Sequence, residues 1–85
     1  MSRILIVDDA PLIRDSVRSL LEASRHEVLE AEDGDVGLER LEGGDVDLCL
    51  VDVNMPRMSG LEMIRRARAQ GFSGPMLVLT TESTR

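Results

Sequence analysis

The sequence of 85 residues contains no lysine, tryptophan or tyrosine, and it has a single phenylalanine, a single histidine and a single cysteine. With Cys49 as its only cysteine, the chain cannot form an internal disulfide, which fits a reducing, cytoplasmic setting. His26 and Cys49 also cannot supply the ligand spacing of a zinc site. Because Phe72 is the only aromatic residue, we expect a hydrophobic core of leucine, valine, isoleucine and methionine.

The balance of charge is strongly acidic. Sixteen acidic residues against ten arginines give a net charge of −6, which argues against binding to a nucleic-acid backbone. The first apolar run, residues 4–7, ends at Asp8 and Asp9, so it is too short for a signal peptide or a membrane span. We therefore expect neither a nucleic-acid partner nor a membrane contact for this segment.

Short apolar runs alternate with amphipathic segments along the chain. The runs predict strands at residues 4–7, 28–29, 48–53 and 76–80. The amphipathic segments predict helices from Pro11 to about Ser24, from the Asp33 turn to Gly43, and from about Leu61 to Gly71. In the first of these helices we expect one apolar stripe, made of Leu12, Ile13, Val17, Leu20 and Leu21.

This alternation predicts a single α/β domain of parallel βαβ units, but it does not fix the order of the strands. Asp8, Asp9, Asp52 and Thr80 each stand at the carboxyl end of a predicted strand, where open α/β sheets bind their ligands. If strands 4–7 and 48–53 are neighbours, about 4.8 Å apart, Asp9 and Asp52 cannot both stay ionised without a cost in free energy. Either one carboxylate takes a proton or a cation lies between them. An open, all-oxygen set favours magnesium over a closed calcium site.

Three stretches together resemble the receiver domain of two-component response regulators. They are residues 4–9, residues 48–56 with Gly60 behind them, and residues 77–81. The spacing of Asp52, Met55, Pro56 and Gly60 is the most specific part, and the loop after Asp52 is most similar to the chemotaxis type. The resemblance covers all 85 residues and implies a flavodoxin-like, doubly wound parallel sheet.

The resemblance also implies a role for each residue of the acidic edge. Asp52 would accept a phosphoryl group from a histidine kinase or a small phosphodonor. Asp9 would bind Mg²⁺ directly, Asp8 would bind it through water, and the backbone carbonyl of Asn54 would complete the protein ligands. Thr80 would donate its hydroxyl to the phosphoryl group and turn inward as a switch. Signalling would pass by contact to a downstream protein target, so we do not expect an enzyme.

Some elements that the resemblance implies are not found in these 85 residues. They are a fourth helix, a fifth strand that carries a lysine, and a fifth helix. We therefore expect a partial receiver domain over residues 1–85, truncated after the fourth strand, with strand order 2-1-3-4 and three helices. One sheet face should be bare over strands 48–53 and 76–80, and the apolar edge strand should favour self-association.

Other interpretations of the same residues remain open at this stage. Two consecutive aspartates after a strand are often only a turn with a helix cap, and Thr80 could be a strand residue without a further role. Besides a phosphoacceptor, the chain could be a phosphorylation-independent dimerisation or interaction module. A third possibility is a fragment of a longer regulator with no role of its own.

Overall fold

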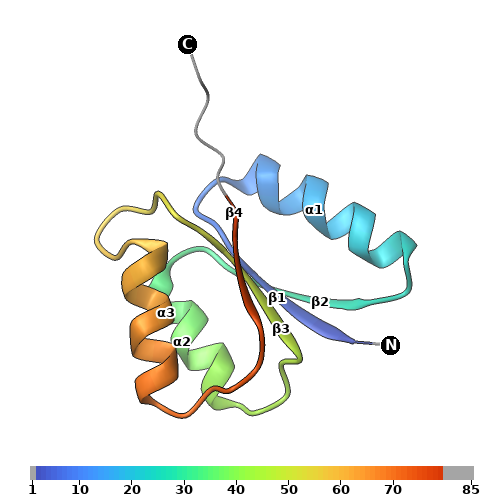
Figure 1. Cartoon of the computed structure of the whole chain (residues 1–85). Coiled ribbons are helices and arrows are strands. Elements are labelled where there is room, and N and C mark those ends of the chain that lie inside the picture. The colour runs from blue at the N-terminus through green and yellow to red at the C-terminus, as the bar shows by residue number, and fades with distance from the viewer. Residues whose placement is uncertain (1, 80–85) are drawn as a thin grey trace.

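The computed structural model describes residues 2–79, which form alternating strands and helices (Figure 1). The predicted strand residue Thr80 lies outside the described residues. The strands are β1 (Arg3–Val7), β2 (Glu27–Ala31), β3 (Leu48–Asp52) and β4 (Met76–Leu79). The helices are α1 (Pro11–Ala23), α2 (Gly34–Glu42) and α3 (Gly60–Ala69).

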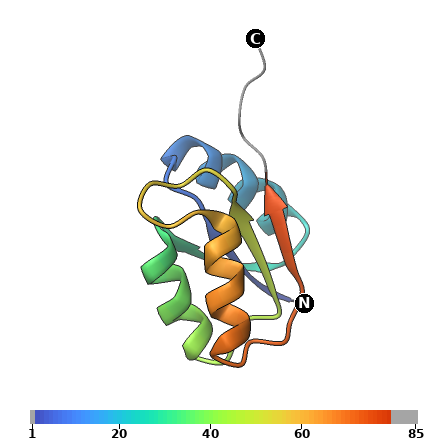
Figure 2. The same cartoon turned by 60° about the vertical axis from the view of Figure 1, so that its left-hand side comes forward.

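The four strands form one parallel sheet in the order β2-β1-β3-β4. Helix α1 lies on one face of the sheet, and α2 and α3 lie side by side on the other (Figures 1 and 2). The predicted α/β class, the strand order 2-1-3-4 and the three helices are thus confirmed for residues 2–79. The strand predicted at residues 28–29 is longer than expected, because its pairing with β1 extends from residue 27 to residue 31.

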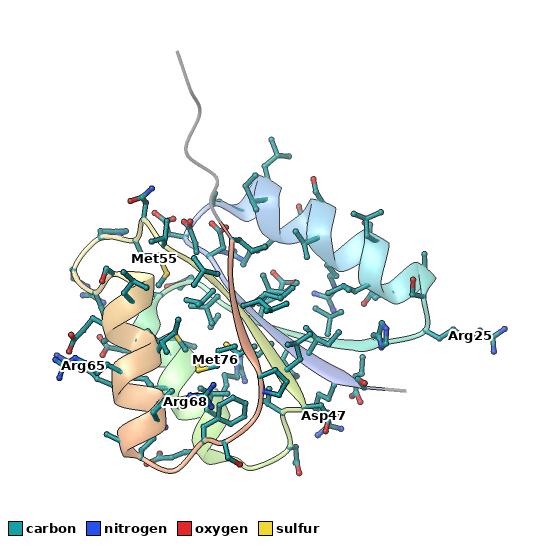
Figure 3. The ribbon with its side chains drawn as sticks, in the orientation of Figure 1. Arg25, Asp47, Met55, Arg65, Arg68 and Met76 are labelled. Carbon is teal, nitrogen blue, oxygen red and sulfur yellow. The ribbon has the colours of Figure 1, made fainter. Side chains whose placement is uncertain are left out.

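The core consists of two layers, one on each face of the sheet. Residues of β1 and β3 alternate between these layers because successive side chains of a strand point to opposite faces. Under α2 and α3 lie Leu5, Val7, Ala31, Leu41, Cys49, Val51, Met55, Met58, Met63 and Ala67. Under α1 lie Ile4, Ile6, Val28 and Leu50. The aliphatic and methionine core is therefore confirmed, and Figure 3 shows Met76 beside it, between β4 and the helices.

Cys49 is fully buried in this core, as predicted. Burial raises the pKa of its thiol to about 12, because the apolar surroundings disfavour the thiolate. A nearby arginine, Arg68, lowers the pKa only in part. The thiol therefore behaves as a small hydrophobic group.

The stripe predicted for α1 is wrong at two positions. Val17 and Leu21 pack against the sheet, but Leu12 and Leu20 are 76% and 71% exposed. Residues four apart, such as Val17 and Leu21, lie on one face of a helix, whereas Leu12 and Leu20 are rotated away from that line. Apolar character alone did not reveal which face the helix turns toward the sheet.

Short polar residues fix the starts of the other two helices. The side chain of Asp33 accepts a hydrogen bond from the Val36 N–H at 2.9 Å, as the Asp33 turn predicted. Ser59 accepts one from the Glu62 N–H at 3.1 Å. Because α3 begins directly behind Asp52, its first residue has no room for a side chain: a Cβ on Gly60 would lie 2.3 Å from the Asp52 carbonyl oxygen.

The bare sheet face predicted over strands 48–53 and 76–80 is found only at β4, because Leu50 of β3 is 8% exposed and packs in the layer under α1. Leu77 and Val78 of β4 are 54% and 42% exposed. Helix α1 packs over β1 and β2, toward the opposite edge of the sheet from β4 (Figure 1). Within residues 2–79, α1 is the only helix on the face of the sheet to which Leu77 belongs. No helix in this range combines the length and the apolar character that a membrane-spanning helix needs.

We expect Gly60→Ala to destabilise the chain by about 2 kcal/mol, because the new methyl group would overlap the backbone of Asp52 and force the loop apart. Gly43→Ala is the matched control, since Gly43 has helical backbone angles and its Cβ would meet only the Arg40 carbonyl at 3.3 Å. Its effect should stay within about 0.5 kcal/mol. Urea denaturation followed by circular dichroism measures both, and equal effects would contradict the close contact.

Candidate functional site

Three carboxylates meet at the carboxyl edge of the sheet. Asp8 and Asp9 directly follow β1, and Asp52 is the last residue of β3. Because β1 and β3 are paired, with Val7 opposite Val51, these side chains come together, and one carboxylate oxygen from each lies within 4.8 Å of the others. Asp8 and Asp52 are buried, at 1% and 2% exposure, and Asp9 is exposed to solvent. The predicted acidic site is therefore assembled with an open side at Asp9.

The Asp8 carboxylate has an unusual environment. Its Oδ1 accepts a hydrogen bond from the Ala10 N–H at 2.8 Å, whereas its buried Oδ2 has no hydrogen-bond partner among the described residues. Burial raises the pKa of the Asp8 carboxyl, and the negative charges of Asp52 and Asp9 raise it further. The Ala10 N–H and Arg14 oppose this shift only in part. An ionised Asp8 thus lacks a compensating group on one oxygen.

Asp9 does not cap the following helix. The N-cap position of α1 is Ala10, which makes no side-chain capping bond, and Pro11 occupies the first turn. The simple interpretation of two aspartates as a turn with a helix cap therefore does not describe Asp9. Its carboxylate faces solvent beside two buried carboxylates.

The chemistry of these donors fits a hard divalent cation. All three side chains offer oxygen, which suits magnesium, calcium or manganese better than metals that prefer nitrogen and sulfur. A cation here would also give the buried Oδ2 of Asp8 a partner and would offset the repulsion among three negative groups. The residues present are thus suited to such an ion.

The loop between β3 and α3 borders the site. The Asn54 N–H donates to the Asp52 Oδ1 at 3.3 Å, and the Val53 N–H donates to the Leu79 carbonyl at 3.1 Å. Met58 is buried against Gly34 at the start of α2, where a Cβ would come within 2.6 Å of its sulfur. Met55, also buried, lies at the same end of the sheet (Figure 3). These contacts hold Asn54 next to the acidic residues, while the predicted site residue Thr80 lies outside the described range.

Two residues that the sequence did not single out also contact this edge. Arg14 of α1 donates from Nη1 to the backbone carbonyl of Asp8 at 2.7 Å and from Nε to the Glu30 carboxylate at 2.9 Å. Burial alone would raise the pKa of the Glu30 carboxyl, but hydrogen bonds from Arg14 and Arg18 outweigh burial and lower it. No local pattern marks these residues, because Arg14 and Glu30 are 16 positions apart and meet only through folding.

A cavity of about 390 Å³ opens beside Asp9 at this edge. It is lined by Asp9, Pro11, Arg14, Glu32, Asp33, Pro56 and Arg57. A larger cavity, of about 500 Å³, lies at the opposite edge of the sheet, where its wall includes Val46 and Phe72. The smaller cavity is therefore the one through which a reactant could approach the acidic residues.

Comparison with known sequences agrees with this geometry. Residues 4–85 match the response regulator receiver domain family. The chain is 38% identical over 81 residues to the transcriptional regulatory protein DltR of Streptococcus agalactiae. The aligned region covers 95% of this chain and 36% of DltR. It is 37% identical over 82 residues to the nitrate/nitrite response regulator protein NarL of Escherichia coli, covering 94% and 38%. The chain thus spans little more than a third of the length of these relatives.

Solved structures give the same result. The chemotaxis protein CheY4 of Vibrio cholerae superposes with a TM-score of 0.90 at 37% identity, covering 99% of this chain and 72% of that one. The response regulator TrrA of Thermotoga maritima, solved in complex with Mg(2+)-BeF, has a TM-score of 0.90 at 36% identity, covering 98% and 72%. The structure of TrrA in complex with the histidine kinase ThkA has a TM-score of 0.89 at 36% identity, covering 99% of this chain and 72% of that one. In sequence, strand order and acidic edge alike, the chain belongs to the receiver domains of two-component response regulators.

Proposed function

We propose that this chain is a phosphoacceptor signalling domain in which Asp52 receives a phosphoryl group. The observation that carries the proposal is the position of Asp52, buried at the end of β3 with oxygens of Asp8 and Asp9 within 4.8 Å. In the reaction a bond forms between a carboxylate oxygen of Asp52 and phosphorus. The bond between phosphorus and the donor atom breaks, and its electron pair leaves with the donor.

The ion that this proposal requires is Mg²⁺. Asp8, Asp9, Asp52 and the backbone carbonyl of Asn54 would hold it. This set agrees with the all-oxygen donors and with the Oδ2 of Asp8, which has no hydrogen-bond partner in the described part of the chain. When bound, Mg²⁺ supplies positive charge that offsets the charge on the oxygens of the transferred phosphoryl group. The Mg(2+)-BeF complex of the related TrrA supports the choice of metal. The chain's own residues position the nucleophile, and the exposed Asp9 leaves one side of the acidic site open.

The proposal extends to partners and readout. A histidine kinase would be the phosphodonor, supported by the complex of TrrA with ThkA. Thr80 would donate its hydroxyl to the phosphoryl group and act as the switch. In this proposal residues 1–85 supply the acidic site of a receiver domain that acts in the cytoplasm. It would signal through contact with a downstream protein, with at most weak self-phosphorylation and autodephosphorylation instead of enzymatic turnover.

One observation favours a second candidate function. On β4, Leu77 and Val78 are 54% and 42% exposed, and the outer edge of this strand has no partner strand among residues 2–79. An apolar edge strand is a template for pairing with another chain, and an exposed apolar face favours association. The alternative is a phosphorylation-independent dimerisation module, formed through the β4 edge or the bare sheet face.

The phosphoacceptor proposal is tested by intact mass. After incubation with Mg²⁺ and a small acyl phosphate, the chain should gain the mass of one phosphoryl group. Asp52→Asn should abolish this gain, because the amide cannot act as the nucleophile. Asp15→Asn, which changes an exposed aspartate of α1, should leave it intact. A folded wild-type chain without a gain, or a gain that persists in Asp52→Asn, would refute the assignment.

The raised pKa of Asp8 predicts how stability depends on pH without metal. Between the ordinary carboxyl pKa of about 3.9 and the raised value, the folded chain holds a proton that the unfolded chain has lost. Stability should therefore fall as pH rises through this window. Asp8→Asn should remove this slope and stabilise the metal-free chain by about 1 kcal/mol at neutral pH. The reason is that it removes a buried charge whose Oδ2 has no partner within residues 2–79.

The same denaturation series tests the metal. Saturating Mg²⁺ should raise the wild-type midpoint, because a ligand that binds only the folded state stabilises it. Asp8→Asn and Asp9→Asn should reduce this gain. An equal gain in all three proteins would place the cation elsewhere.

The dimerisation alternative is tested by sedimentation velocity of the 85-residue chain at micromolar concentration. If β4 mediates association, Leu77→Glu should shift the chain to monomer, since it places a charge on the exposed apolar surface. Asp52→Asn should leave the association unchanged. A monodisperse wild-type monomer would eliminate this alternative.

A further inference from the structure

Arg14 joins the acidic edge to the neighbouring strand. Its guanidinium donates from Nη1 to the Asp8 carbonyl oxygen at 2.7 Å and from Nε to Oε1 of Glu30 at 2.9 Å. The two charged side chains are mostly shielded from solvent, at 17% and 22% exposure. One planar group thus links α1, the turn after β1 and the end of β2.

The remaining contacts of Asp8 show what this link holds in place. The Asp8 N–H donates to the Ala31 carbonyl at 3.1 Å, while the Asp8 carbonyl accepts from Arg14. The Asp8 Oδ1 accepts a hydrogen bond from the Ala10 N–H, and the buried Oδ2 has no hydrogen-bond partner among the described residues. Both polar groups of the Asp8 backbone are therefore tied to the last two residues of β2, one of them directly and the other through Arg14.

The guanidinium is itself held in position. Glu30 uses its second oxygen to pair with Arg18, and Arg18 also donates to Glu22 at 3.0 Å. This arrangement fixes the Glu30 carboxylate from two sides, so that Arg14 meets it in one orientation. Two donors in a rigid plane can reach the carbonyl and the carboxylate together, whereas the single ammonium of a lysine lacks this fork.

We propose that Arg14 is the positioning residue of the metal ligands: it fixes the turn of Asp8 and Asp9 against β2, so that their carboxylates meet Asp52. This inference rests on the proposed Mg²⁺ site. Two simpler roles make different predictions. A purely structural ion pair would change stability without changing metal affinity. A purely electrostatic role would repel Mg²⁺, so that removing the charge would tighten binding.

The test is calorimetric titration of the folded 85-residue chain with magnesium chloride. Arg14→Met and Arg14→Lys should both weaken Mg²⁺ binding about tenfold, the size typical of lost outer-shell support. The lysine variant matters because it keeps the charge and loses the fork. Arg65→Met is the control: it removes an exposed arginine of α3 whose side chain bonds to Glu62, away from Asp8 and Glu30, and it should change affinity by less than about twofold.

Urea denaturation and the amide resonance of Ala10 accompany the titration. Loss of Arg14 should shift the Ala10 amide signal, because its acceptor on Asp8 moves, and Arg65→Met should not. If Arg14→Met does not fold, Arg14→Lys carries the test, and Glu30→Gln weakens the same link from β2.

Wild-type affinity in both Arg14 variants would overturn the positioning role while leaving the proposed function intact. Tighter binding in Arg14→Met would overturn it in favour of the electrostatic role. A folded wild-type chain that binds no Mg²⁺ would refute the metal site of the proposed function, and this inference with it.

Discussion

The parallel pairing of β1 with β3 is the interaction on which the acidic site depends. It aligns Val7 with Val51, so the residues that follow, Asp8 and Asp52, meet at the same edge. The two strands are buried on both faces, and burial of their apolar side chains provides the favourable free energy of this arrangement. The same pairing forces negative charges together. The pairing that buries the apolar residues of β1 and β3 thus also brings Asp8 and Asp52 close together.

The outer strands hold the two turns of this edge. The Asp8 N–H donates to Ala31 at the end of β2, and the Val53 N–H donates to Leu79 at the end of β4. Each turn is therefore anchored by a backbone bond to the strand beyond it. Gly60 adds a steric limit, because α3 starts in contact with the carbonyl of Asp52. All four strands and the first residue of α3 thus fix the site, although its carboxylates come only from the ends of β1 and β3.

Conflict between stability and charge is common where a protein has a functional site. Here the conflict is located at Asp8, whose buried Oδ2 has no hydrogen-bond partner among residues 2–79 and whose carboxyl pKa is raised. A bound cation and a transferred phosphoryl group would act on these same charges. The exposed leucine and valine of β4 are a separate departure from ordinary packing, on a surface that faces solvent in this chain.

Local sequence determined much of this protein. Apolar runs and turn residues predicted the strands, the helices and the cap at Asp33, since these depend on neighbouring residues. The aspartates were found because strand ends share an edge in α/β sheets, and the family resemblance supplied the strand order. Tertiary structure alone decided that Leu12 and Leu20 face solvent and that Arg14 joins Asp8 to Glu30. Both depend on how α1 lies across the sheet, and that position follows from packing between distant segments.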